Sequence, residues 1–78
     1  MTEHRDIILY LGPSSYKNYA YKARTDMPIG KIAIAYADRF GIDFRTIALF
    51  KGDQFINPYT KVETFNNNDF LQVRIVNN

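Results

Sequence analysis

The segment that decides the fold reads Asp26-Met27-Pro28-Ile29-Gly30-Lys31-Ile32-Ala33-Ile34-Ala35-Tyr36-Ala37-Asp38-Arg39-Phe40-Gly41. Its large apolar side chains recur every three to four residues, which places them on one face of an amphipathic helix: Ile29, Ile32, Ala33, Tyr36 and Phe40. Asp26 is expected to cap the first amides, and Pro28 is tolerated in the first turn. Gly41 follows the last apolar position, where a left-handed C-cap is favoured. The segment therefore predicts one helix of about three turns.

The rest of the chain predicts strands, because no second helical pattern occurs in the 78 residues. Residues 6–11 and 19–25 have the alternation of strands and predict a hairpin across the turn-forming residues 12–15. Three shorter strands are expected at residues 46–50, 54–56 and 70–76. Core positions in this half of the chain are expected at Val62, Phe65, Leu71, Val73 and Ile75.

The predicted order of elements is β-β-α-β-β-β, an α+β pattern. The first and last strands are the most apolar, so pairing them in parallel inside one mixed sheet, with the helix across one face, buries both apolar stripes. That arrangement is the β-grasp. Residues 1–5 are polar and are expected to form a short flexible arm before a single domain of residues 6–78. A domain of this size is close to the limit at which a hydrophobic core outweighs chain entropy.

Charge and composition argue against several classes of partner. The net charge of +2 is small and the basic residues are scattered, so no nucleic-acid partner is expected. No apolar run reaches the roughly 18 residues of a membrane span, and the N-terminal residues lack the apolar core of a signal peptide. The absence of cysteine suits a reducing compartment without proving one. We expect a nuclear or cytoplasmic protein, either a monomer or a subunit of a protein complex.

The sequence shows no pattern typical of a catalytic or metal site. His4 is the only histidine, and no acid, nucleophile or second ligand stands at a spacing that would recruit it. Gly41 and Gly52 occupy turn positions, and no glycine-rich phosphate-binding fingerprint precedes the helix. We therefore expect no catalytic residues, no metal and no cofactor, and we do not expect an enzyme.

Three motifs carry a resemblance to a known family: Ala35-Tyr36-Ala37-Asp38-Arg39-Phe40-Gly41-Ile42, Leu49-Phe50-Lys51-Gly52-Asp53-Gln54-Phe55-Ile56-Asn57 and Asn68-Asp69-Phe70-Leu71-Gln72-Val73. They are similar to the helix end, the glycine turn and the final acidic turn and strand of ubiquitin-like proteins, most closely of SUMO. The resemblance spans about residues 7–76 and implies the ubiquitin-like β-grasp. A weaker resemblance to the ubiquitin-fold modifier family rests on Ile56-Asn57-Pro58 and Val73-Arg74-Ile75-Val76. Such patterns indicate a fold more firmly than a function.

Two features depart from the SUMO pattern. Conjugated modifiers end in a flexible diglycine tail, and the 78 residues contain no Gly-Gly pair. Lys51 also stands where SUMO proteins usually carry an acidic residue that helps to hold their conjugating enzyme. The resemblance thus leaves two functions open: a non-catalytic interaction domain, or a covalent modifier whose diglycine tail is not among these residues. We expect the 78 residues alone to form no thioester with SUMO-activating enzyme.

The resemblance also implies a peptide-binding groove between the helix and the second strand. SUMO proteins there bind short hydrophobic motifs with acidic flanks, as an added strand. The matching positions in this sequence are Tyr21, Lys22, Ala23, Arg24, Lys31, Ile32, Ala35 and Arg39. The alternative is that Tyr21 and Ile32 belong to the core and that the charges are only solvated. A third possibility is an assembly subunit whose interface contains the leftover apolar residues Ile34, Phe44 and Phe70.

Overall fold

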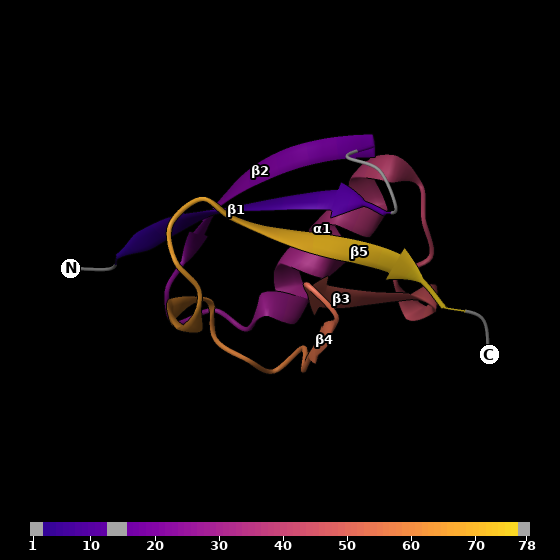
Figure 1. Ribbon diagram of the computed structural model, residues 1–78. Helices are drawn as coiled ribbons and strands as arrows, with labels where there is room; N and C mark the ends of the chain where they lie inside the picture. The colour runs from indigo at the N-terminus through magenta and orange to yellow at the C-terminus, as the bar shows by residue number, and fades with distance from the viewer. Residues whose placement is uncertain (1–2, 13–15, 77–78) are drawn as a thin grey trace.

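The computed structural model describes residues 3–12 and 16–76 (Figure 1). It contains one mixed sheet and one helix, in the predicted order. The elements are β1 (His4–Leu11), β2 (Tyr16–Arg24), α1 (Ile29–Phe40), the 3-10 turn η1 (Phe44–Thr46), β3 (Ile47–Lys51), β4 (Gln54–Ile56), the 3-10 turn η2 (Val62–Thr64) and β5 (Asp69–Ile75). The turn predicted at residues 12–15 falls largely on residues 13–15, which lie outside the described residues.

The strand order in the sheet is β2-β1-β5-β3-β4. β1 and β5 pair in parallel with Leu9 opposite Leu71, whereas the other neighbouring strands are antiparallel. The helix crosses one face of this sheet (Figure 1). The predicted parallel pairing of the first and last strands is confirmed, and β2 and β4 are left at the two edges.

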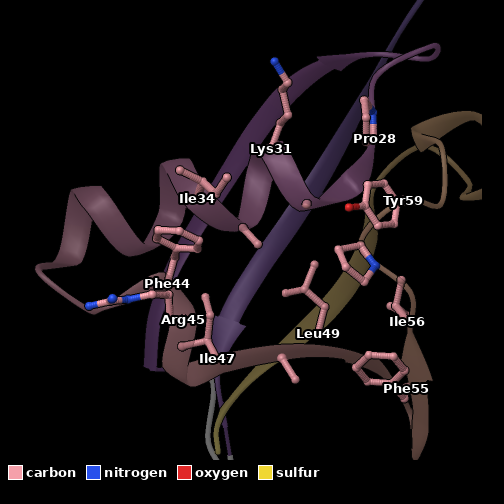
Figure 2. A pocket seen from close by; sticks show the side chains of 14 residues that line it. Pro28, Lys31, Ile34, Phe44, Arg45, Ile47, Leu49, Phe55, Ile56 and Tyr59 are labelled. Carbon is pink, nitrogen blue, oxygen red and sulfur yellow. The ribbon is translucent and has the colours of Figure 1, made fainter.

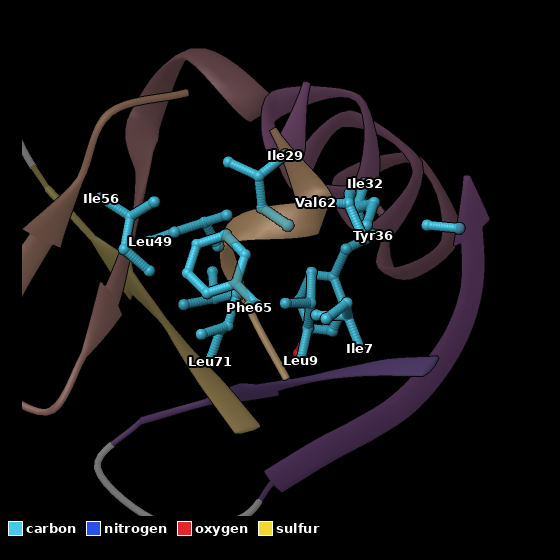
Figure 3. Packing of buried hydrophobic residues seen from close by; sticks show 12 residues of the cluster. Ile7, Leu9, Ile29, Ile32, Tyr36, Leu49, Ile56, Val62, Phe65 and Leu71 are labelled. Atoms are coloured by element: carbon cyan, nitrogen blue, oxygen red, sulfur yellow. The ribbon is translucent and has the colours of Figure 1, made fainter. Parts of the chain in front are cut away.

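The core lies between α1 and the facing side of the sheet (Figure 3). Leu71 and Val73 are buried as predicted, and Ile7, Leu9 and Leu49 on the neighbouring strands are buried with them. Val62 and Phe65 close the cluster from η2 and the residue after it, as predicted. Ile75, expected inward, is 54% exposed. It is the last residue of β5, and the buried cluster on that strand ends at Val73.

The two ends of the helix show one confirmed cap and one wrong prediction. Gly41 has a left-handed conformation with φ of 68°, and the amide of Ile42 donates to the carbonyl of Ala37 at 2.8 Å. Asp26 does not cap the N-terminus. Backbone carbonyls from a distant loop take the first amides instead, since Ile29 N donates to Thr60 O at 2.7 Å and Gly30 N to Pro58 O at 2.9 Å. The Asp26 carboxylate pairs with Arg24 at 2.8 Å.

The flexible arm predicted for residues 1–5 is wrong at His4 and Arg5, which pair in β1 with Arg24 and Ala23 of β2. The Arg5 guanidinium donates through Nη1 to the carbonyl oxygens of Glu63 and Phe65. These two carbonyls lie at the end of η2, so Arg5 ties the start of β1 to the segment that closes the core. Residues 1 and 2 lie outside the described residues.

The carboxylate of Asp69 should make the free energy of unfolding depend on pH in the acidic range. Burial by itself would raise the pKa of Asp69, but hydrogen bonds from Lys51 Nζ and Asn66 N, both at 2.9 Å, outweigh it and lower that pKa. A carboxyl whose pKa is lowered by folding stabilises the protein above its unfolded pKa of about 3.9, and this contribution is lost as the pH falls through the folded pKa. Urea denaturation from pH 6 to pH 2 should therefore show a shallower loss of stability in Asp69→Asn than in the parent protein. An unchanged slope would show that the Asp69 carboxylate is not linked to folding.

Candidate protein-interaction surfaces

The outer edge of β2 is one candidate surface, because no other strand of the described chain pairs with it. The register places Tyr21 opposite Ile7 and Tyr19 opposite Leu9, so these tyrosines face the helix. Lys22 and Arg24 alternate with them and lie on the opposite face of the sheet. β2 therefore presents a free backbone edge with tyrosines on its helix side and basic side chains on its other side.

The predicted floor of the groove is mostly core. Ala23 and Ile32 are each 3% exposed and belong to the buried cluster, which agrees with the alternative that the sequence left open for Ile32. Tyr21 is half-buried, and its hydroxyl has no hydrogen-bond partner among the described residues. Burial raises the pKa of the Tyr21 phenol. Ala35 is exposed on the helix, so a ligand at this edge would contact Tyr21 and Ala35 more than Ala23 or Ile32.

Residues near the start of β2 fill the space beside the end of the helix. The Arg39 guanidinium lies 3.9 Å from the centroid of the Tyr19 ring, and the Tyr19 and Tyr21 rings are 4.8 Å apart. Farther along, the Tyr36 hydroxyl donates to the carbonyl of Lys17 at 2.8 Å. Sequence reasoning placed Arg39 at this site but missed Tyr19. The signal was present, since Tyr19 is two residues before Tyr21 and shares its face.

A pocket of about 460 Å³ lies on the other side of the helix, between α1 and β3–β4 (Figure 2). We call it the α1–β3 pocket. Its main apolar lining comes from Ala33, Ile34, Phe44, Ile47, Ala48, Leu49, Phe55, Ile56, Pro58 and Tyr59. Small residues leave the space open: Gly30, Ala33 and Ala48 contribute little side chain to it. Lys31 and Arg45 supply the basic groups of the lining, so Lys31, expected in the β2 groove, also borders this pocket.

The predicted second interface is only partly brought together. Ile34 and Phe44 both line the α1–β3 pocket. Phe70 does not, because it pairs with Ile8 on the outer face of the sheet, where its ring meets Tyr10 at a centroid distance of 6.4 Å. The structure therefore does not bring Ile34, Phe44 and Phe70 together on one surface.

Lys51 has a structural partner in the fold. Its ammonium lies 2.9 Å from the Asp69 carboxylate, which leads into β5. At the turn that is acidic in the SUMO pattern, the negative charge of Asp69 is thus neutralised by Lys51 of the same chain. This arrangement weakens the case for a SUMO-type contact with a conjugating enzyme at that surface.

Comparisons with solved structures identify the fold. No family model matches the chain, and no curated protein matches it. Among solved structures, a ubiquitin from Caldiarchaeum subterraneum aligns with a TM-score of 0.84 and 9% identity, covering 96% of each chain. The fold is the ubiquitin-like β-grasp. A second structure, described as "Molecular Mimicry of SUMO promotes DNA repair", aligns to this chain with a TM-score of 0.74 and 16% identity, over 91% of this chain and 90% of the other.

Identities of 9% and 16% to these two solved structures establish the fold alone, so the function has to be inferred from the residues of this chain. In residues 3–12 and 16–76, no group of three or more His, Asp or Glu side chains is arranged to hold a metal ion. The single helix that the structure describes is too short to cross a membrane. The edge of β2 and the α1–β3 pocket are two surfaces of this chain at which a partner could bind.

Proposed function

We propose that this ubiquitin-like domain is a non-catalytic interaction module that recruits partner proteins by adding an extended segment to the edge of β2. The observation that carries the proposal is the position of the nine-residue β2 at the edge of the sheet, where it pairs with β1 on one side and with no described strand on the other. An unpaired strand edge is a template for β-augmentation, in which main-chain hydrogen bonds supply affinity and side chains supply selectivity.

Charge supports an acidic partner. Lys22 and Arg24 flank the edge from the sheet side, and Arg39 flanks it from the helix, stacked on Tyr19. Asp26 neutralises part of this set through its ion pair with Arg24. A segment with a Val or Ile core would lie along Tyr21 and Ala35, and carboxylates beside that core would face the basic groups. The SUMO-like resemblance points to the same class of partner.

A synthetic peptide with a Val-Ile-Val-Ile core followed by Glu-Glu-Asp tests this proposal; we call it the strand peptide. We expect micromolar affinity, because a short flexible peptide loses chain freedom on binding. The peptide is also made in two N-methylated forms, one for each of its two alternate sets of residues. Methylation of the set whose amides face β2 should weaken binding by about tenfold or more, because each lost backbone hydrogen bond is worth about 0.5–1.5 kcal/mol. Isothermal titration calorimetry gives the three affinities, and equal affinity of all three peptides would rule out strand addition.

Arginine variants supply a matched control. Arg24 and Arg45 are both exposed, and each donates through Nε and Nη2 to an aspartate two residues away. Arg24→Glu should lower the affinity for the strand peptide by about three- to tenfold, and this loss of affinity should become smaller as the salt concentration rises. Arg45→Glu changes the same charge on the other side of the helix and should leave this affinity unchanged. Equal losses in both variants would indicate attraction by net charge alone.

A covalent modifier is the second candidate, favoured by the match to an archaeal ubiquitin over 96% of both chains. It would require a diglycine tail, and the 78 residues contain none. Incubation of the 78-residue chain with SUMO-activating enzyme and ATP should therefore yield no adduct. A band that disappears with reductant would favour the modifier. The native coding sequence after Asn78 distinguishes the two candidates directly.

A further inference from the structure

We propose that the α1–β3 pocket is a second docking site, which accepts a bulky apolar anchor, aromatic or leucine, from a partner segment with carboxylates beside the anchor. This site is separate from the β2 edge, because β2 and β3 lie on opposite sides of the central β1–β5 pair. The domain would then be able to hold two segments at once, one along β2 and one in the pocket.

Exposed apolar side chains are concentrated at this pocket. Seven large apolar residues are exposed in the described part of the chain, and four of them line the pocket: Ile34, Phe44, Phe55 and Tyr59. Figure 2 shows Ile34 beside Phe44 at one end of the pocket, with Phe55 and Tyr59 at the other. Scattered exposed apolar residues are ordinary, but a cluster around a concavity is typical of a protein-binding surface.

The pocket has a firm apolar floor and room for a large side chain. Leu49 and Ile56, at its base, are 4% and 8% exposed and belong to the core. Its volume of about 460 Å³ lies within the range of about 300–1,000 Å³ that is usual for ligand pockets. An anchor placed here would rest against residues that are already fixed by the fold, so binding would require little ordering of the domain.

The charges of the lining select an acidic neighbour for the anchor. Lys31 and Arg45 are the charged residues of the lining, and no described carboxylate lines the pocket. Arg45 is paired with Asp43 at 2.9 Å, whereas Lys31 makes no ion pair within residues 3–12 and 16–76. Carboxylates next to the apolar anchor would meet these two cations. A basic segment, in contrast, would meet two like charges and gain no compensating carboxylate.

A display library of random short peptides tests the proposal without a known partner. The probe is the library itself, selected on the 78-residue domain alone, and the selected peptides are then measured on Phe44→Ser. The matched control is Phe70→Ser, which makes the same change at a similarly exposed phenylalanine on the outer face of the sheet. We expect selected peptides to carry Phe, Trp or Leu beside Asp or Glu. Their affinity for the Phe44→Ser domain should be at least about fivefold weaker than for the parent domain, and their affinity for the Phe70→Ser domain should be unchanged.

Charge variants and NMR mapping complete the test. Asp43→Asn preserves a cap for the η1 amide of Arg45 and releases the Arg45 side chain from its ion pair. Asp43→Asn should raise the affinity for a selected acidic peptide by about two- to fivefold, and Arg45→Glu should lower that affinity by a similar factor. Amide shifts should appear at residues 31–34 and 44–49. Selected peptides that carry basic residues, or that ignore Phe44→Ser, would overturn the proposal.

Two further outcomes separate this proposal from other occupants. Shifts confined to residues 17–24 would overturn the pocket and leave the β2 proposal standing. Shifts of the pocket amides on raising the concentration of the domain alone would show that a second copy fills the pocket, which would also overturn the proposal. The strand peptide should bind Phe44→Ser as it binds the parent protein, so the two sites can fail independently.

Discussion

Replacing Leu71 by alanine lowers the free energy of unfolding by about 2–5 kcal/mol, because it removes most of a fully buried side chain and leaves a cavity. Leu71 lies on β5 opposite Leu9 and faces the helix in the centre of the core. Small domains are stable by only about 5–15 kcal/mol, so this one change removes a large part of the total. Urea denaturation followed by circular dichroism measures the loss.

The adjacent residue provides the control for that prediction. Phe70 is 57% exposed and lies on the outer face of the sheet, where its ring meets that of Tyr10 at a centroid distance of 6.4 Å. Phe70→Ala deletes a larger side chain than Leu71→Ala, yet it should cost less than about 1 kcal/mol. A loss at Phe70 equal to that at Leu71 would mean that the two faces of β5 have been assigned wrongly.

Arg5→Met lowers the free energy of unfolding by about 1.5–3 kcal/mol. The substitution keeps an apolar stem but removes the charge-assisted hydrogen bonds to the carbonyls of Glu63 and Phe65. Freed of Arg5, the η2 segment should open more often, and hydrogen exchange should accelerate at the amides of Glu63 and Phe65, which donate to Thr25 O and Val62 O.

Arg24 is the matched control for Arg5. It pairs across the β1–β2 ladder with His4, the residue before Arg5, and it is exposed, with its guanidinium bound only to Asp26 among the interactions described. Arg24→Met should leave the stability and the exchange of the η2 amides close to those of the parent protein. Unchanged η2 exchange in Arg5→Met would show that Arg5 does not hold this segment.

Local patterns predicted most of the fold. The spacing of Ile29, Ile32 and Tyr36 defines a helix whichever partner covers it, and Gly41 has a left-handed backbone conformation that favours glycine and depends on local geometry. Asp26 was a wrong prediction for the cap because the first amides of the helix donate to the carbonyls of Pro58 and Thr60 instead. These carbonyls are distant in sequence and come close to the helix only in the folded chain. Arg5 was missed for the same reason, since its partners are 58 and 60 residues away in sequence.

The candidate surfaces could be predicted only in part. Ile34 and Phe44 stand out in the sequence as apolar residues without a place in the core, and so does Phe70. Alternation along the last strand already places Phe70 on the face opposite Leu71 and Val73, whereas only the folded structure shows that Ile34 and Phe44 meet at the α1–β3 pocket. The sequence also could not show that Lys22 and Arg24 lie on one side of the β2 edge and Arg39 on the other.

The most direct test of the central proposal, strand addition at β2, is an isotope-filtered NOE experiment on the labelled domain with the unlabelled strand peptide. We expect contacts between backbone protons of the peptide and backbone protons of residues 19–23, with side-chain contacts to Tyr21 and Ala35. Saturating peptide that gives no contact to the β2 backbone, or gives contacts only to Ile34 and Phe44, would contradict it.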